Sequence, residues 1–312
     1  MPWKDRYTIS DEQSLTDDQV VWADGKACCV TIVVDLSPLC GPAGLSKVSL
    51  CTPEAHYSRN GGLSALRALL KRTGLRATFA VPAVLAGVMS DTLRALQDEG
   101  HEIAAHGYLR EDVSLLDASE EARRLELTTR ELEHATGKRP SGWFSLPRQG
   151  DKFAGGAISN HTAGLLLDAG YDYLGNSLAD DIPHYWVSDF ATARCILALP
   201  YYYHFDDQFF LMFPAKGTGL EHPDVLSRNW QAELAAQYKR GRQFSMVLHP
   251  HAIAWPNRML VLEQFIDVLQ GYPRLWNPTS AECAAYWSGR YPASQFLRLE
   301  PSIWQDYPGS LS

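Results

Sequence analysis

The chain has 312 residues, of which 46% are hydrophobic and 21% charged, a balance that is typical of globular proteins and excludes disordered and collagen-like classes. Its 36 acidic and 28 basic side chains leave a formal net charge of -8 without a long basic run, so we expect no nucleic-acid partner. The chain lacks both an apolar stretch of about 18 residues and a signal-peptide pattern, which predicts a cytoplasmic protein without membrane contact.

The amino-terminal residues 1–27 read as an irregular polar arm, in which Trp3 and Trp22 are candidate anchors. The run ACCVTIVVD follows at 27–35, and its continuous apolarity is typical of a strand buried on both faces of a parallel sheet. Cys28 and Cys29 open this run, and we predict that they face opposite sides of it as small core residues. None of the six cysteines has CxxC spacing, so a zinc ribbon or dithiol redox site is not expected.

After a Pro-, Gly- and Ser-rich loop at 36–59, predicted strands and helices alternate. The further strands are predicted at 76–81, 102–105, 142–145, 171–174, 196–199, 244–248 and 274–276. The helices are predicted from a cap at Asn60 to Gly74, at 90–99, 117–135, 158–169, 225–238 and 258–270, and after Thr279. About seven such units without a GxGxxG loop or a linker predict one α/β domain, a (β/α) barrel with parallel strands inside and helices outside, with an open sheet as the alternative.

Polar side chains follow the predicted strands, where the active sites of such barrels form. These side chains are Asp35, His106, Arg148, Asp180, Asp181, His204, Asp206, Asp207, His249 and His251. A single one of them would carry little weight, but their convergence on one rim predicts an active site.

Several ordered segments resemble the polysaccharide deacetylase superfamily, carbohydrate esterase family 4. They are VTIVVD at 30–35, RATFAVPAVLA at 76–86, GHEIAAHGY at 100–108, GKRPSGW at 137–143, LLLDAGYDYLGNS at 165–177 and SMVLHPH at 245–251. The resemblance implies a distorted barrel, often seven-stranded, over residues 28–290, with 291–312 as a tail. It also implies hydrolysis of an amide C–N bond other than a peptide bond.

The residues that the resemblance assigns to chemistry are only partly present. Metal-dependent members bind Zn²⁺ or another divalent cation through Asp, His and His, with a nearby Asp as base and a late His as acid. Asp35 and His106 fall on the first two ligands and His249 on the late acid. The base position, two residues before Asp35, is Val33, and the second ligand His is replaced by Arg110, which cannot bind a cation. We therefore predict no metal cofactor.

The same losses occur in the metal-independent allantoinases and related cyclic-amide hydrolases, which this chain resembles better. The matching features are Asp112 six residues after His106, Arg148 after GKRPSGW, DDIPHYW at 180–186 and LHPHAIAWPNRM at 248–259. The first loop, LSPLCGPAG, lacks the acidic pair expected in that subgroup, and QGDKFAGGA at 149–157 also differs, so the predicted substrate is not allantoin specifically.

The predicted catalytic residues are Asp35, His106 and His249. His249 would exchange protons, because an unperturbed His titrates near pH 6.5, and Asp35 would orient and polarise His106. Arg148 would bind a carbonyl or carboxylate of the substrate. The remaining predicted substrate-binding residues are Tyr108, Asp112, Asp181, Trp186, Asp207, His251 and Trp255.

Structural alternatives accompany these roles: Asp112 as a helix cap, Arg148 paired with Asp181, and Trp255 as a core or oligomer contact. The predicted function is hydrolysis of a non-peptide amide C–N bond in a small cytoplasmic metabolite. That metabolite would be a cyclic ureide, a cyclic imide or an N-acyl compound. One alternative is a metal-dependent N-deacetylase, with zinc bound by Asp35, His106 and either Asp112 or His251. The other is an inactive barrel that binds sugar or a partner protein. The resemblance also implies a homodimer or homotetramer.

Overall fold

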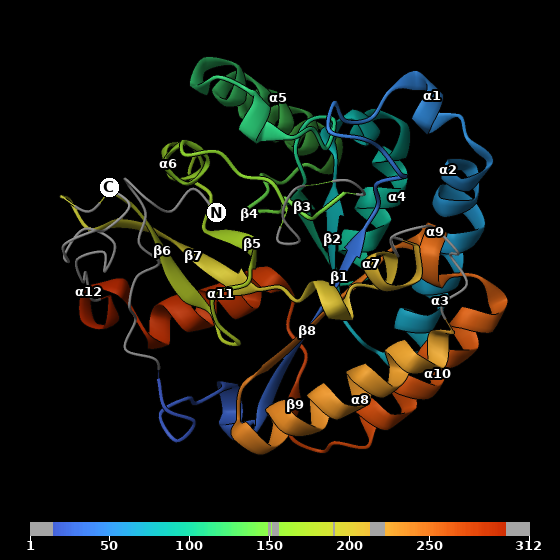
Figure 1. Cartoon of the computed structure of the whole chain (residues 1–312), viewed down its shortest axis with the longest axis vertical. Helices are drawn as coiled ribbons and strands as arrows, with labels where there is room; N and C mark the ends of the chain where they lie inside the picture. The colour runs from blue at the N-terminus through green and yellow to red at the C-terminus, as the bar shows by residue number, and fades with distance from the viewer. Residues whose placement is uncertain (1–14, 149–150, 152–155, 190, 213–221, 298–312) are drawn as a thin grey trace, which may run out of the picture.

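The computed structural model describes residues 15–148, 151, 156–189, 191–212 and 222–297, so Trp3 lies outside the described residues. Its centre is a sheet of parallel strands with helices packed outside it (Figure 1). In spatial order the parallel strands are β7 (Arg194–Pro200), β5 (Tyr173–Ser177), β4 (Gly142–Trp143), β3 (Glu102–Ala105), β2 (Thr78–Val81), β1 (Cys28–Asp35) and β8 (Gln243–Leu248). The short β9 (Leu275–Trp276) pairs with the start of β1.

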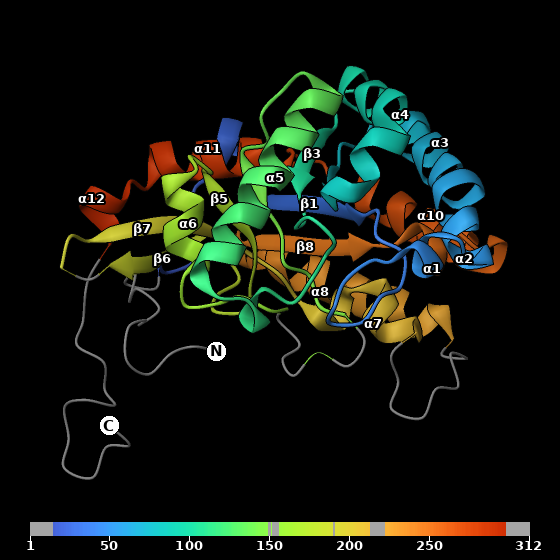
Figure 2. The same ribbon diagram turned by 90° about the horizontal axis from the view of Figure 1, so that it is seen from above.

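The longer helices are α3 (Leu63–Thr73), α4 (Ala86–Asp98), α5 (Ala118–Thr136), α6 (Thr162–Asp168), α8 (Pro223–Arg240), α10 (Pro256–Gln270) and α11 (Ser280–Arg290). The shorter ones are α1 (Lys47–Leu50), α2 (Pro53–Tyr57), α7 (Asp207–Met212), α9 (Pro250–Ile253) and α12 (Ala293–Phe296). Seen from above, α3, α4 and α11 lie along one side of β1 and β8, and α7 and α8 lie along the other (Figure 2). No helix within the described ranges combines the length and the hydropathy needed to cross a bilayer.

Alternation along β1 explains why the strand is buried throughout. Cys28 belongs to the core between the sheet and the helices, whereas Cys29 and Val33 belong to a second core inside the barrel. This confirms that the two cysteines face opposite sides. Since side chains alternate along a strand, Asp35 faces the same interior as Val33, at the carboxyl end of β1.

The parallel ladder matches the predicted barrel, but it does not close in the described residues. β6 (His184–Asp189) pairs antiparallel with β7 and forms one edge, while β8 forms the other. A single parallel bridge between Asp206 and Val247 spans this gap. The sequence predicted no strand at β6, because the alternation of strands and helices does not reveal a hairpin inserted into it.

The segment before β1 packs against α11. Trp22 is buried, and its ring centroid lies 5.3 Å from that of Trp287 on α11. The predicted loop at 36–59 contains α1 and α2. The predicted cap at Asn60 is wrong, because a π-helical turn over Ser58–Gly62 joins α2 to α3 and Asn60 lies inside it.

Candidate active site

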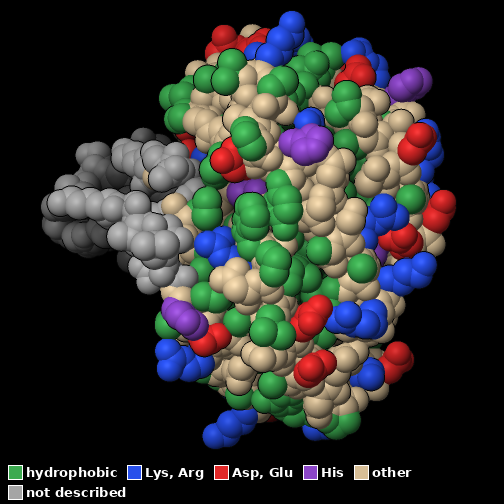
Figure 3. Space-filling model, turned by 90° about the vertical axis from the view of Figure 1, so that its right-hand side faces the viewer, with side chains coloured by type: hydrophobic (Ala, Val, Ile, Leu, Met, Phe, Trp, Pro, Cys, Tyr) green, Lys and Arg blue, Asp and Glu red, His purple; other side chains and the backbone are tan. Residues whose placement is uncertain are grey.

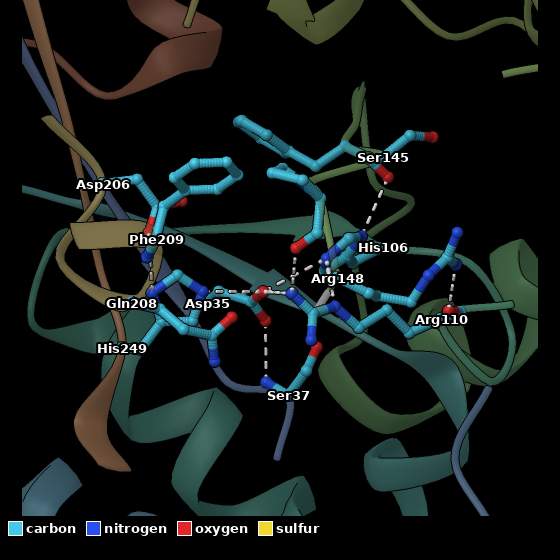
Figure 4. A network of polar contacts seen from close by, with 12 residues as sticks. Asp35, Ser37, His106, Arg110, Ser145, Arg148, Asp206, Gln208, Phe209 and His249 are labelled. Atoms are coloured by element: carbon cyan, nitrogen blue, oxygen red, sulfur yellow. Dashed lines mark hydrogen bonds and ion pairs between the residues drawn. The ribbon is translucent and has the colours of Figure 1, made fainter. Parts of the chain in front are cut away.

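Asp35 lies at the centre of a buried polar cluster at the carboxyl ends of the strands (Figure 4). Its Oδ1 atom accepts a hydrogen bond from the backbone N–H of Ser37 at 2.7 Å. Its Oδ2 atom lies 2.8 Å from Arg110 Nη2, 3.2 Å from His249 Nε2 and 3.3 Å from His106 Nε2. Burial alone would raise the pKa of the Asp35 carboxyl, but Arg110, His106 and His249 hold it well below its usual value. Asp35 is therefore a carboxylate.

The hydrogen bonds of His106 indicate where its proton lies. Nδ1 is 3.0 Å from the carbonyl oxygen of Phe144, which can only accept, so Nδ1 carries the hydrogen. Nε2 accepts from Nε of Arg110 at 3.2 Å. Burial lowers the pKa of His106 despite the opposing influence of Asp35, so the ring is neutral near pH 7. Asp35 and His106 lie together as predicted, but the Nε2 lone pair faces Arg110.

Arg110 stands where the resemblance implies a second metal-binding histidine, four residues after His106, and its side chain reaches the centre of the cluster (Figure 4). It also donates to the carbonyl oxygen of Pro147 at 3.0 Å. Burial opposes its charge, but Asp35 outweighs that effect and raises the pKa of Arg110, so the guanidinium stays charged. Because it cannot donate a lone pair and engages both Asp35 and His106, these residues do not fit the three-ligand metal site of the family.

His249 follows β8, and its imidazole lies between Asp35 and a pair of acidic residues at the start of α7. Nδ1 lies 2.7 Å from Oδ1 of Asp207 and 3.6 Å from Oδ1 of Asp206. The bridge between Asp206 and Val247 holds this segment beside β8. Burial lowers the pKa of His249, but the acidic charges of Asp206 and Asp207, with hydrogen bonds to Asp207 and Asp35, raise it to about 10. His249 is therefore an imidazolium that can donate a proton.

Arg148 is buried beside Arg110 and does not contact Asp35. Its Nη1 donates to the carbonyl oxygen of Arg110 at 2.6 Å, and its Nε pairs with Asp151 at 3.0 Å. Oδ2 of Asp112 lies 3.6 Å from Arg148 Nη2, and Oδ1 caps a 3-10 turn by accepting from the N–H of Ser114. The predicted alternative of Asp112 as a helix cap is thus observed. The predicted pairing of Arg148 with Asp181 is wrong, because Asp151 takes that place.

Two residues predicted to bind substrate lie away from the cluster. The carbonyl of Asp181 accepts from the N–H of Gln243, the first residue of β8, whereas His249 follows the last, so Asp181 lies at the opposite end of that strand. Its carboxylate pairs with Arg240 and Arg242. Trp186 is buried on β6 as part of the hydrophobic core. Both corrections follow from β6, which carries DDIPHYW away from the rim.

Of the other predicted residues, His251 lies beside His249, with ring centroids 5.5 Å apart. His251 is buried on α9, where its Nε2 contacts the amide nitrogen of Gln208. Tyr108 is half-buried against the hydrophobic core. Trp255 precedes α10, is 43% exposed and stacks on Tyr57 with ring centroids 4.3 Å apart.

On the side of the molecule where α2, α3 and α10 lie, hydrophobic side chains gather in the middle and charged ones surround them (Figure 3).

The sequence assigned no catalytic or binding role to Arg110 or Gln208, and it named Asp206 only among the polar residues that follow the strands. The signal for Arg110 was its position four residues after His106, which marked the loss of a ligand but not the contact with Asp35. Asp206 was visible beside Asp207, but only the pairing with β8 shows that both approach His249. Gln208 carried no signal, because its role depends on the geometry of α7.

Other candidate ligands also have protein partners already. The Asp112 carboxylate already contacts Arg148 and Ser114, and His251 contacts Gln208. Neither side chain therefore completes a metal-binding site with Asp35 and His106. Among the described residues, Asp206, Asp207 and His249 have ligand atoms within 4.8 Å of one another. The Asp206 oxygens already accept from the Tyr201 hydroxyl and the Phe209 N–H, and the Asp207 oxygens accept from His249.

Comparison with known proteins adds the family. The sequence model of the family described as polysaccharide deacetylase matches residues 51–174. This part of the chain therefore matches a polysaccharide deacetylase domain. This domain confirms the predicted class of enzyme, a hydrolase of carbon–nitrogen bonds other than peptide bonds. The chain is 25% identical over 232 residues to a peptidoglycan deacetylase of Helicobacter pylori, which covers 66% of this chain and 76% of the relative.

Solved structures of similar fold agree with the domain. A putative polysaccharide deacetylase from Mycobacterium smegmatis has a TM-score of 0.73 at 24% identity, over 91% of this chain and 98% of that chain. A probable polysaccharide deacetylase from Pseudomonas aeruginosa PAO1 has a TM-score of 0.73 at 21% identity, over 87% and 94%. Puue allantoinase has a TM-score of 0.73 at 20% identity, over 87% and 93%. At these identities the likeness confirms the barrel fold of the domain.

Proposed function

We propose that this polysaccharide deacetylase domain hydrolyses a non-peptide amide bond in a small molecule without a bound metal ion. The observation that carries the proposal is the position of Arg110. Its Nη2 lies 2.8 Å from Asp35 Oδ2, and its Nε lies 3.2 Å from His106 Nε2. A fixed cation of the protein thus engages the two side chains that would bind a metal ion in the family.

The charge of Arg110 suits the stabilisation that amide hydrolysis requires. Attack of water on an amide carbonyl places a negative charge on the carbonyl oxygen, and preorganised donors in a water-poor site stabilise such a charge strongly. Arg110 is buried, held by Asp35 and by the Pro147 carbonyl, and permanently charged. It would stabilise the oxyanion from a fixed position.

The two histidines differ in the way that an acid–base pair requires. In the proposed step the water oxygen bonds to the carbonyl carbon while one water proton passes to the neutral Nε2 of His106, which gives up the hydrogen bond that it accepts from Arg110. The C–N bond then breaks as Nε2 of His249 donates its proton to the leaving nitrogen. Asp35 Oδ2 lies within 3.3 Å of both nitrogens, so it can return the proton from His106 to His249 and reset the site.

The test combines metal analysis with a substrate screen. Protein prepared without an affinity tag is analysed for zinc, manganese and iron, and its activity on cyclic ureides, imides and N-acyl compounds is measured before and after chelation. We expect far less than one metal ion per chain and unchanged activity. About one ion per chain, with activity lost on chelation and restored by the ion, would refute the proposal in favour of the metal-dependent alternative.

A second substrate class is favoured by the similarity to the peptidoglycan deacetylase of Helicobacter pylori. The screen therefore includes N-acetylated glycan fragments, and release of acetate from them, but not from small amides, would indicate a polymeric substrate. The cytoplasmic location and the homo-oligomeric state stay predictions.

A further inference from the structure

A cavity opens beside the polar cluster, on the side of His106 and Arg110. It is partly open to solvent, and Glu111, Trp143 and Arg148 also line it. His106 and Arg110 thus face both Asp35 and this cavity. A molecule in the cavity would lie next to His106 and Arg110, two of the groups that the proposed reaction uses.

Two buried polar atoms of opposite character belong to side chains that line this cavity. Nη2 of Arg148 and Oε1 of Glu111 have no hydrogen-bond partner among the described residues. Their side chains are only 3% and 6% exposed. The nearest opposite charges are Asp112 Oδ2 at 3.6 Å from Arg148 Nη2 and Arg124 Nη1 at 3.7 Å from Glu111 Oε1. Both separations exceed a hydrogen bond, so each atom is buried without one.

The rest of each side chain is held in place. Arg148 donates through Nη1 to the Arg110 carbonyl and through Nε to Asp151. Glu111 accepts the N–H of Leu109 with its other oxygen, Oε2, at 2.5 Å. Only Nη2 of Arg148 and Oε1 of Glu111 are left without a hydrogen bond. An unpaired buried donor or acceptor is costly, so a ligand that satisfies both would gain from each.

We propose that Arg148 and Glu111 form a subsite for an uncharged secondary amide group, in which a carbonyl oxygen and an N–H are adjacent. Arg148 Nη2 donates to the carbonyl oxygen, and Glu111 Oε1 accepts the N–H. This subsite deepens the proposed function, on which it rests, by assigning the substrate a neutral amide edge at this position.

The local charge excludes an anionic group from the subsite. The positive charge of Arg148 is already paired with Asp151 at 3.0 Å and faces Asp112 at 3.6 Å. A carboxylate ligand would add a further negative charge beside these two and beside Glu111, whose free oxygen would repel it. An amide without an N–H would leave Glu111 Oε1 unpaired.

Binding of three matched probes tests the subsite in the full-length chain. Succinimide has an adjacent carbonyl and N–H, N-methylsuccinimide lacks the N–H, and succinate is charged. Titrations followed by NMR, which also detects ring opening, should show that succinimide binds at least about tenfold more tightly than the other two. Equal affinities, or no succinimide binding at about 50 mM, would overturn the subsite.

Glu111→Gln provides the discriminating variant, because it keeps the size of the side chain and replaces the free acceptor with a donor. The remaining oxygen still accepts from the Leu109 N–H, so the new NH₂ faces the cavity. The affinity for succinate should therefore rise at least about tenfold relative to the affinity for succinimide. Arg148→Lys should remove the preference for succinimide. Glu131 lies on α5 with its side chain 42% exposed, so Glu131→Gln serves as the control. Melting curves check folding.

The results separate this inference from the proposed function. Amide hydrolysis with no preference among the probes would overturn the subsite alone. A preference for succinimide that Glu111→Gln reverses, in a chain that hydrolyses no amide, would support the subsite and overturn the proposed function alone. An unchanged order of affinities in Glu111→Gln counts against the subsite in either case.

Discussion

Nη2 of Arg110 lies 2.8 Å from Oδ2 of Asp35, inside a cluster where both side chains are almost fully buried. A buried pair of this kind contributes little net stability compared with apolar residues, but loss of one partner leaves an uncompensated charge. The pair is therefore best explained by the chemistry of the site. Its removal should affect both activity and folding.

Arg110→Ala should lower turnover at least about 100-fold, because the oxyanion would lose its fixed cation. It should also lower the free energy of unfolding by about 3 kcal/mol or more, since Asp35 would be left as a buried carboxylate with only the histidines beside it. Arg110→Lys, which keeps the charge but not the two-nitrogen contact, should fold and recover part of the activity. Kinetics and urea unfolding of both variants give the measurement, and unchanged turnover in Arg110→Ala would rule out the assigned role.

Arg110→His should convert the cluster into a metal site. The new imidazole, four residues after His106, would join Asp35 and His106 as the third ligand. We expect the variant to bind about one zinc ion per chain in a calorimetric titration, while the wild-type chain binds none at this position. Arg110→Ala is the matched control, because it removes the guanidinium without supplying a ligand. Equal zinc uptake by the wild type and the variant would show that Arg110 does not block the site.

The pH dependence of kcat/KM should be broad. His249 must be protonated to act as the acid, and its pKa is raised to about 10, so activity should fall as the pH rises through that value. His106 must be neutral, and its pKa is lowered below the ordinary value of 6.5, so the acidic limb should lie below that pH. Asp207→Asn removes one of the charges that raise the His249 pKa and should move the alkaline limb to lower pH. An alkaline limb that does not move would show that Asp207 does not set the pKa of the catalytic acid, His249.

The same shift predicts how stability changes with pH. An unfolded His releases its proton near pH 6.5, whereas folded His249 keeps it until about pH 10. The raised pKa therefore stabilises the fold fully below pH 6.5, and this contribution is lost as the pH rises toward 10. Unfolding titrations across this range should show a steeper decline in the wild type than in Asp207→Asn.

Asp181→Asn separates the corrected assignment from the predicted one. Asp181 pairs with Arg240 and Arg242 at the far end of β8, so the variant should keep kcat and KM within about twofold and lower the melting temperature by a few degrees. Asp207→Asn is the contrast, because the Asp207 carboxylate contacts His249 directly. A large loss of turnover in Asp181→Asn would place that residue in the site after all.

The sequence by itself determined the barrel and the core of its site. Continuous apolar runs that end in Asp35, His106 and His249 are local signals, and parallel strands bring their carboxyl ends together whatever the details of packing. The same local reading showed that Val33 cannot act as a base and that Arg110 cannot bind a metal. The first conclusion needed only strand alternation, whereas the second also needed the family resemblance, which assigns the base and a metal ligand to these two positions.

Tertiary structure alone decided which polar residues reach that site. The hairpin of β6 and β7 breaks the alternation of strands and helices, so DDIPHYW leaves the rim and Asp181 pairs with Arg240 instead. The bridge between Asp206 and Val247 joins segments that are distant in sequence and places Asp207 on His249. Local patterns do not encode such pairings, because the direction of a long side chain and the partner of a charge depend on what the whole fold packs around them.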